Sequence, residues 1–338
     1  MIKAWNSAEF SDFYTDNIFP VLTTPYAMLT SQAPFSVGEI MLIALLPIFL
    51  GTLIAALLKH FWREFPLFVA IIVTIMCLNC FVLYHCTPIK VSDEPQTEYE
   101  LQQLADLRDY LVETCNSYAQ QIPHDEEGNV IYEGDMTEQA KEAVAALSAT
   151  YPKLRGFLVT PKALLFSGFM SQQYMQGYYF PFSMEANYND DMYLMNKPFT
   201  MCHEIAHTKG YIYEDEANYL GFLACIGSED IVIRYSGYLG VLNYVNNDFY
   251  NSVERSVYDS HVKISDQVKY DNQFLTDEAW KKVEDNSILD TQTVKDAADA
   301  FIDANQKANG IAEGKASYTH VVGLLLEYYY HGAGAGTF

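Results

Sequence analysis

Two long apolar runs constrain this chain more than any other feature. Residues 40–58 and 65–86 contain no Asp, Glu, Lys or Arg. Each run reaches the roughly 20 residues that a helix needs to cross about 30 Å of hydrocarbon. Pro47 and Gly51 interrupt the first run, but bilayers tolerate these residues in helices better than water does. We expect two transmembrane helices in a lipid bilayer, with a pair of buried core helices as the alternative.

The loop between the runs sets the expected orientation. It carries Lys59 and Arg63 against Glu64, whereas the outer flanks of both runs are acidic. The positive-inside rule places such a loop in the cytoplasm and both chain ends outside it. We therefore expect an extracytoplasmic segment 1–37, a transmembrane hairpin 38–87 and an extracytoplasmic domain 88–338.

The net charge of that domain limits the classes of molecule that it can bind. The chain has a formal net charge of −23, and nearly all of it falls after residue 90. An acidic surface repels nucleic-acid phosphates and anionic lipid headgroups. The composition therefore excludes nucleic acid as an expected partner.

The pattern after the second run predicts an α+β domain that is mainly helical. Leucines recur at helical spacing in 99–122, and 137–151 also reads as a helix. The aromatic stretch 161–189 is broken by glycines and predicts two or three short strands. From residue 198 onward the pattern is helical almost to the end.

The segment 203-HEIAH-207 is the strongest chemical signal. Residues four apart lie on one face of a helix, so His203 and His207 can bind one metal ion. Glu204 lies about 100° around the helix, where it can act as a general base without ligating the metal. The alternative is a solvent-facing helix, but Phe199 and Ile205 favour a half-buried one.

A zinc hydrolase needs a third protein ligand and leaves a fourth position to water. Gly210 predicts a turn, after which Glu214 begins a second helix with Asn218 one turn behind it. We assign Glu214 as the ligand, at about 2.0–2.2 Å from zinc, and Asn218 as an acceptor that orients an imidazole. Glu216 lies about 200° around that helix from Glu214 and is the alternative ligand.

Three further expectations concern the surroundings of this motif. Arg234 is the preferred group to stabilise the oxyanion of a tetrahedral intermediate. Segment 180–189 is placed to be an edge strand that pairs with extended substrate. Cys202 and Cys225 flank the motif and could form a disulfide or remain as free buried thiols.

The same residues carry a resemblance to known families. HEIAH followed by Glu214, Ala217 and Asn218 resembles the gluzincin metallopeptidases, many of which have Asp at the position of Asn218. The whole chain from residue 34 resembles domain-of-unknown-function family 3810, bacterial membrane-anchored HExxH proteins. The matching stretches are 34–40, 178–187, 198–211, 214–225, 234–238 and 304–322. The resemblance implies a zincin-like (minimal gluzincin) outer domain in a bacterial cell membrane, but no particular substrate.

Two functions follow from the motif. The first is a membrane-anchored zinc metallopeptidase, in which Glu204 deprotonates a zinc-bound water and the substrate is a peptide or protein. The alternative is a non-catalytic zinc-binding envelope protein that binds or senses a peptide, but such a site would not need Glu204. An intramembrane protease is less favoured, because HEIAH lies more than a hundred residues beyond the second run.

Overall fold

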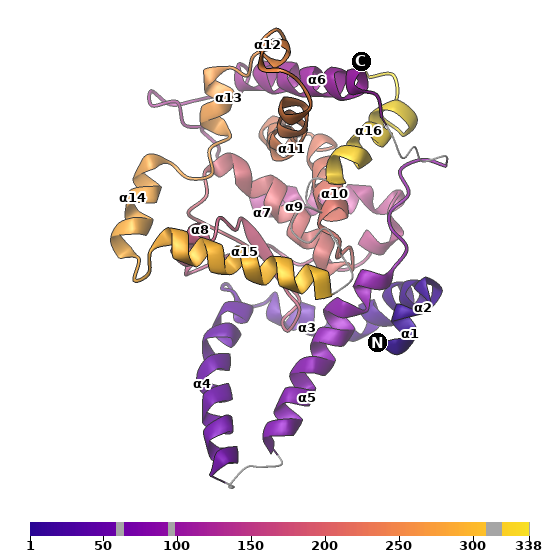
Figure 1. Cartoon of the computed structure of the whole chain (residues 1–338), viewed down its shortest axis with the longest axis vertical. Helices are drawn as coiled ribbons and strands as arrows, with labels where there is room; N and C mark the ends of the chain where they lie inside the picture. Colours follow the sequence, from indigo (N-terminus) through magenta and orange to yellow (C-terminus); the bar gives the residue numbers. More distant parts are fainter. Residues whose placement is uncertain (59–63, 94–98, 309–319, 338) are drawn as a thin grey trace.

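Two helices project from a mainly helical body (Figure 1). The computed structural model describes residues 1–58, 64–93, 99–308 and 320–337. The projecting helices are α4 (Val37–Leu57) and α5 (Glu64–Met76), and a π-helical turn, η2 (Cys77–Phe81), continues α5 into the body. Two stretches, α4 and the continuous helix Glu64–Phe81 formed by α5 and η2, are long and apolar enough to cross a membrane. Only the first turn of α4 is buried and no residue of α5 is, so the alternative of buried core helices is wrong for these two helices. The end of the second run differs, because Cys80, Leu83 and Tyr84 are buried in the core of the body. Lys59 and Arg63 lie outside the described residues.

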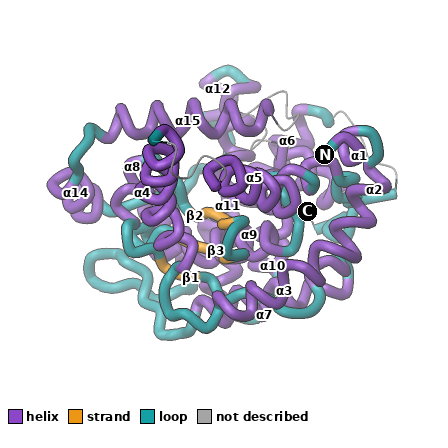
Figure 2. Tube along the Cα trace, turned by 90° about the horizontal axis from the view of Figure 1, so that it is seen from below, coloured by secondary structure: helices purple, strands orange, loops and turns teal. Residues whose placement is uncertain are grey.

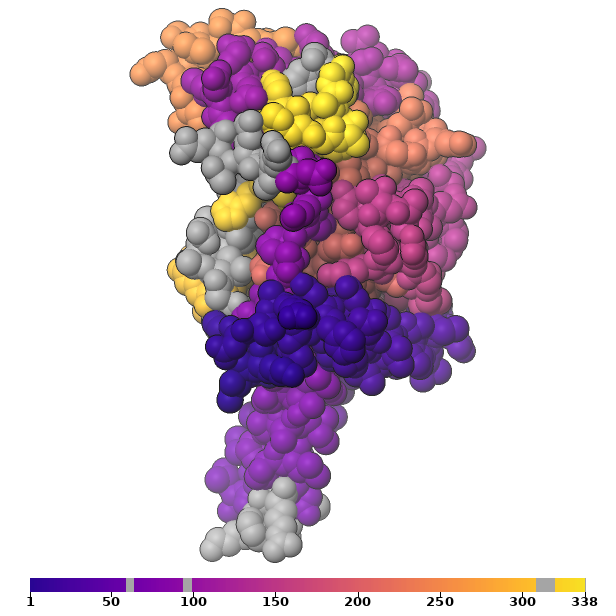
Figure 3. Space-filling model, turned by 90° about the vertical axis from the view of Figure 1, so that its right-hand side faces the viewer, coloured from indigo at the N-terminus to yellow at the C-terminus, as the bar shows by residue number. Residues whose placement is uncertain are grey.

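The N-terminal helices form the base of the body, beside the point where α4 and α5 leave it (Figure 3). These are α1 (Ile2–Trp5), α2 (Ala8–Phe13) and α3 (Phe19–Thr30), with a π-helical turn η1 (Tyr14–Ile18) between the last two. Tyr14, Phe19 and Ala27 are buried and belong to the same hydrophobic core as the helices of the body. The first 30 residues therefore pack as part of the body.

A three-stranded sheet lies between the body helices and the projecting pair. Strands β1 (Lys162–Ala163), β2 (Gly177–Phe180) and β3 (Glu185–Tyr188) have the order β1-β3-β2. β1 pairs with β3 in parallel, and β2 pairs with it antiparallel, with Tyr178 opposite Asn187. The prediction of short strands within 161–189 is confirmed. The prediction that 180–189 is an edge strand is wrong, because β1 covers the far side of β3 and leaves β2 at the edge.

The centre of the body is a pack of long helices. Helices α9 (Lys197–Thr208), α10 (Glu214–Ile226) and α11 (Ile231–Ser252) lie against one another. Helices α6 (Leu101–Ala119), α7 (Met136–Ala146) and α16 (Val321–His331) cover them. The shorter peripheral helices are α8 (Ser167–Gln172), α12 (Arg255–Tyr258), α13 (Asp266–Asp271) and α14 (Asp277–Asn286), followed by the longer α15 (Thr291–Ala308). The prediction of a mainly helical domain with a small sheet is confirmed.

The first projecting helix is tied to the sheet through its N-terminus. The backbone N–H groups of Val37 and Gly38 donate to the Glu185 carboxylate of β3 at 3.1 and 2.6 Å. The Lys162 ammonium on β1 lies 2.6 Å from that carboxylate and also donates to the Phe35 carbonyl. Because both charges are buried, they must be paired and hydrogen-bonded. The start of α4 is therefore fixed relative to β3.

The second projecting helix is tied to the same hairpin. Asn79, in η2, donates to the Pro181 carbonyl between β2 and β3 at 2.7 Å. In return the Tyr179 hydroxyl on β2 donates to the Asn79 carbonyl at 3.0 Å. Seen from below, β2 and β3 accordingly appear between α4 and α5 (Figure 2). The β2–β3 hairpin joins the body ends of both candidate spans.

Candidate metal centre

Helix α9 carries the HEIAH segment across the sheet. The predicted stop after it is confirmed: Gly210 has φ of +92°, and its N–H donates to the His207 carbonyl. A residue with a side chain rarely adopts this left-handed conformation, so glycine suits the turn. The chain then reverses and α10 returns along α9, which brings Glu214 to the two histidines.

Three side chains from these two helices meet at one point. His203 Nε2 lies 3.2 Å from Glu214 Oε2, and His207 Nε2 lies 3.5 Å from the same oxygen. The ligand atoms of all three residues lie within 4.8 Å of one another. The two imidazole rings are nearly perpendicular, with centroids 4.5 Å apart. Such a group could hold a metal ion.

The histidine rings are oriented by their remaining ring atoms. His207 Nδ1 lies 2.7 Å from the Tyr211 carbonyl oxygen. A carbonyl oxygen only accepts, so Nδ1 carries the proton and Nε2 is the atom that faces Glu214. His203 hydrogen-bonds with Asn218, and this bond partly opposes the lowering of the His203 pKa. Asn218 Nδ2 has no partner in the described chain, so the side-chain oxygen of Asn218 is the acceptor. Metal-binding histidines are commonly held in this way.

The electrostatics of the cluster reflect its burial and its opposite charges. Burial and the neighbouring His207 lower the pKa of His203. Burial alone would lower the pKa of His207, but Glu214 raises it to about 9. Burial alone would raise the pKa of Glu214, but His207 and hydrogen bonds from both imidazoles lower it. Glu214 is therefore an ionised carboxylate that attracts positive charge to this point.

Glu204 lies beside His203, His207 and Glu214 but does not hydrogen-bond to any of them. Its side chain is buried, and burial raises its pKa to about 8. Within the described part of the chain, its Oε2 atom has no hydrogen-bond partner. Leaving a buried polar atom unpaired costs about 1–3 kcal/mol, more if it is charged. An orphaned oxygen of this kind points to a role toward a bound molecule.

Strand β2 presses closely against Glu204. A β-carbon built on Gly177 would lie 2.8 Å from Glu204 Oε1 and 2.6 Å from the Asn187 carbonyl oxygen. Position 177 therefore requires glycine if the edge strand is to approach the carboxylate this closely.

The four residues open into a cavity of about 550 Å³, which we call the site cavity. Its walls come from α9, α10, α11, β2 and α15, and from the body end of the second span. The contributions from outside the HEIAH and Glu214 helices include Met76, Cys80, Gly177, Tyr178, Tyr244, Phe301 and Ile302.

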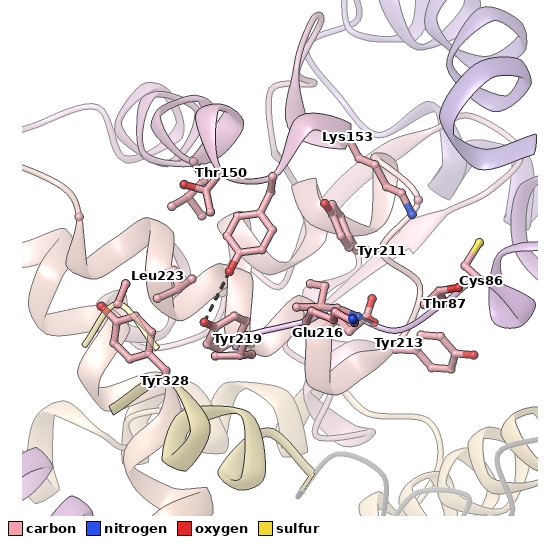
Figure 4. A pocket seen from close by; sticks show the side chains of 18 of the residues that line it. Cys86, Thr87, Thr150, Lys153, Tyr211, Tyr213, Glu216, Tyr219, Leu223 and Tyr328 are labelled. Carbon is pink, nitrogen blue, oxygen red and sulfur yellow. Dashed lines mark hydrogen bonds between the residues drawn. The ribbon is translucent and has the colours of Figure 1, made fainter. Parts of the chain in front are cut away.

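A second cavity, of about 590 Å³, lies on the other side of α10 (Figure 4). Glu216 faces it, together with Lys153, Tyr211 and Tyr219. The Glu216 carboxylate accepts from the Ile89 backbone N–H at 2.7 Å, and burial raises its pKa to about 7. The structure thus brings Glu214, rather than the alternative Glu216, to the histidines.

Comparison with known protein families shows to which family the chain belongs. Residues 14–326 match the profile of the family described as "Protein of unknown function (DUF3810)". The chain belongs to this family. The curated proteins give no match, and neither do the solved structures. The function of this DUF3810 protein must therefore be argued from its site.

Arg234 is not part of the DUF3810 site. Its guanidinium donates to the Glu229 carbonyl and lies over the Tyr118 ring, and Arg234 does not line the site cavity. The expectation that it stabilises an oxyanion is therefore wrong. Arg234 lies in the first turn of α11, whereas the cavity meets that helix at Gly240 and Tyr244. Gly240 is six residues further along the helix, about 9 Å, and about 240° around it, so the arginine side chain points away from the cavity.

Tyr244 is a site residue that sequence reasoning missed. It lines the site cavity and hydrogen-bonds with Asn218, and burial raises its pKa to about 12. The only sequence signal is that it follows Arg234 on the same predicted helix.

The two cysteines beside the motif are free thiols. Cys202 and Cys225 are both buried, with their sulfur atoms 3.7 Å apart. Of the two alternatives left open by the sequence, the structure has the free thiols in contact.

Proposed function

We propose that this DUF3810 protein is a membrane-anchored zinc-dependent metallopeptidase with a zincin-like site. One observation carries the proposal: a buried carboxylate oxygen of Glu204, without a partner in the described chain, faces the cavity beside the His203–His207–Glu214 group. A purely structural metal site needs ligands but no base. The alternative, a non-catalytic zinc-binding envelope protein, leaves Glu204 unexplained.

The donor set fits zinc. Two imidazole nitrogens and one carboxylate oxygen are the ligands of many catalytic zinc sites. When bound, zinc would polarise a peptide carbonyl and make water easier to deprotonate. His207 already presents Nε2 through its hydrogen bond to Tyr211, so little rearrangement of that ring is needed.

Glu204 supplies the proton transfers. Its carboxylate accepts a proton from the attacking water, whose oxygen bonds to the carbonyl carbon. The C–N bond then breaks, and Glu204 passes the proton to the departing amine. Burial raises the pKa of Glu204 to about 8, which gives its ionised form a high affinity for a proton. The products are a free carboxylate and a free amine.

Strand β2 provides a place for the substrate backbone. It is the edge strand, and Gly177 and Tyr178 line the site cavity. An extended peptide can add to such an edge through main-chain hydrogen bonds. Because position 177 is glycine, β2 can approach Glu204 closely, and a peptide added at this edge would lie near the carboxylate.

Tyr244 is the group we assign to the developing negative charge. Because its pKa is raised to about 12, the hydroxyl keeps its proton at neutral pH. It can then donate a hydrogen bond to the carbonyl oxygen as that oxygen becomes an oxyanion.

The proposal also places the domain outside the cytoplasm. Its basis is the basic loop between the spans, and reporter fusions after residue 100 test it. An enzyme reporter that works only outside the cytoplasm should be active there, and a cytoplasmic signal would overturn the orientation.

The decisive experiment pairs metal analysis with peptide cleavage. The full chain and its Glu204→Gln variant are purified in detergent, assayed for bound zinc and incubated with a mixed peptide library. We expect zinc in both and new peptide termini only with the native chain. Zinc in both without cleavage by either would support the non-catalytic alternative.

A further inference from the structure

The position of the site cavity says which substrates can reach it. If α4 crosses the membrane, its 21 residues cover about 30 Å, the full hydrocarbon thickness. The outer boundary of the hydrocarbon then falls near Val37. That residue donates directly to Glu185 of the sheet. The sheet therefore lies at the membrane surface rather than far above it.

The second span independently places the outer boundary of the hydrocarbon at the same height relative to the sheet. Residues Glu64–Phe81 form 18 residues of continuous helix, which covers about 27 Å. The outer boundary then falls near Phe81. Met76 and Cys80 lie just inside it, and both line the site cavity. One wall of the site cavity is thus the outer end of a membrane span.

Exposed apolar side chains lie around the outer boundary of the hydrocarbon. Leu165 and Phe166 follow β1, and their backbone N–H groups donate to Glu39 in the first turn of α4. Both side chains are largely exposed, as is Phe169 one turn later. On the other side, Phe301 of α15 is 74% exposed and lines the site cavity. In Figure 1, α15 crosses above the two spans. We call Leu165, Phe166, Phe169 and Phe301 the apolar rim.

The apolar rim is suited to lipid rather than to water. Exposed apolar groups around a membrane anchor gain free energy by entering the bilayer interface. The rest of the domain is strongly acidic, so headgroup attraction does not explain its position. Insertion of the apolar rim would hold the site cavity against the bilayer.

We infer that the substrate is itself membrane-anchored and is cut within a few residues of the point where it leaves the bilayer. The inference rests on the proposed peptidase function. A substrate beside α5 would pass from the hydrocarbon to the wall formed by Met76 and Cys80. Its first extended residues would then lie along β2, next to Glu204. The sequence distance that disfavoured an intramembrane protease does not separate HEIAH from the bilayer in space, because the fold brings HEIAH back to the outer ends of the spans.

The test compares one cleavable sequence at different distances from a membrane. A segment selected from the peptide library is joined to a transmembrane helix through spacers of about 3, 12 or 30 residues, or left soluble. All are presented to the native chain in the same proteoliposomes. We expect the shortest spacer to be cleaved at least tenfold faster than the longest one or the soluble peptide, through its higher effective concentration at the site.

The outcomes separate the two proposals. Equal rates for all four substrates would overturn the inference and leave the peptidase function standing. Failure of the zinc-loaded native chain to cut any member of the peptide library would instead overturn the peptidase function.

A binding measurement removes dependence on turnover. A photo-crosslinking amino acid replaces Phe301 in the Glu204→Gln variant, and in a matched control it replaces Tyr250, an exposed aromatic residue at the far end of α11. We expect the short-spacer substrate to crosslink at position 301 and not at 250. Equal labelling at both positions would contradict a membrane-side entry.

Discussion

Two cavities flank the start of α10, and glutamates two residues apart face different ones. Glu214 lies against two imidazoles, and its pKa is lowered despite burial. Glu216 faces tyrosines, Lys153 and a backbone N–H, and burial raises its pKa to about 7. Both residues are shielded from water, so burial alone does not decide their ionisation. The neighbours do, and only the first cavity has the neighbours of a metal site.

The largest difference should appear between two single variants, in which either Glu214 or Glu216 is replaced by alanine. Glu214→Ala removes one of three ligands and should weaken zinc binding by about 100-fold or more. Glu216→Ala removes an acceptor from Ile89 and should leave zinc affinity nearly unchanged. Competition with a fluorescent chelator measures both. If Glu216→Ala weakened zinc binding more than Glu214→Ala, the metal would have to bind in the other cavity.

Crowding the first cavity should abolish most activity without removing the metal. In Gly177→Val, the added carbon atoms meet the Glu204 carboxylate and the Asn187 carbonyl. We expect kcat/KM for peptide cleavage to fall about 100-fold, because Glu204 or β2 must shift by about 1 Å. Gly323→Ala is the control, since a β-carbon there meets nothing within 4 Å. Full activity in Gly177→Val would mean that β2 does not bound the reacting centre.

A smaller difference, in kcat, is expected between two variants in which a tyrosine of one cavity or of the other is replaced by phenylalanine. Tyr244→Phe should lower kcat about tenfold to a hundredfold with little change in KM, because it removes a donor used in the transition state. Tyr219→Phe removes a hydroxyl that bonds with Tyr151 in the second cavity and should leave kcat unchanged. Steady-state kinetics with one peptide distinguishes them. Equal kcat values for both variants would remove Tyr244 from the mechanism.

The smallest effect concerns stability at Glu216. Its folded pKa of about 7 exceeds the ordinary value of 4.5, so the folded protein favours the protonated form. That preference stabilises the fold below about pH 4.5 and is lost as the pH rises through about 7. Glu216→Gln cannot ionise, so it should be more stable than the native chain by about 1–3 kcal/mol at pH 8 and equally stable near pH 4.5. Thermal unfolding in detergent at both pH values tests this sign.

Local geometry explains what the sequence could predict. The i, i+4 spacing of His203 and His207, the turn at Gly210 and the rotation between Glu214 and Glu216 all act within a few residues. The helix at 99–122 followed from its leucine spacing in the same way, and the structure has it as α6. Each of these features depends only on helix periodicity.

Features that depend on distant partners could not be predicted. β1 has two residues, too few to show a pattern, yet its pairing moves the sheet edge from β3 to β2. Arg234 could not be excluded from the sequence, because nothing local says that the cavity meets α11 at Gly240 and Tyr244 rather than at its first turn. The nearness of HEIAH to the spans depends on bonds from Glu185 and Asn79 to residues far along the chain.

The central claim is that one metal ion binds in the first cavity and none in the second. Crystals of the zinc-loaded Glu204→Gln variant, measured at the zinc absorption edge, test it directly through an anomalous difference map. We predict one peak bounded by His203, His207 and Glu214, at about 2.0–2.2 Å from each ligand atom. A map with no peak there, or with its peak beside Glu216, would contradict it.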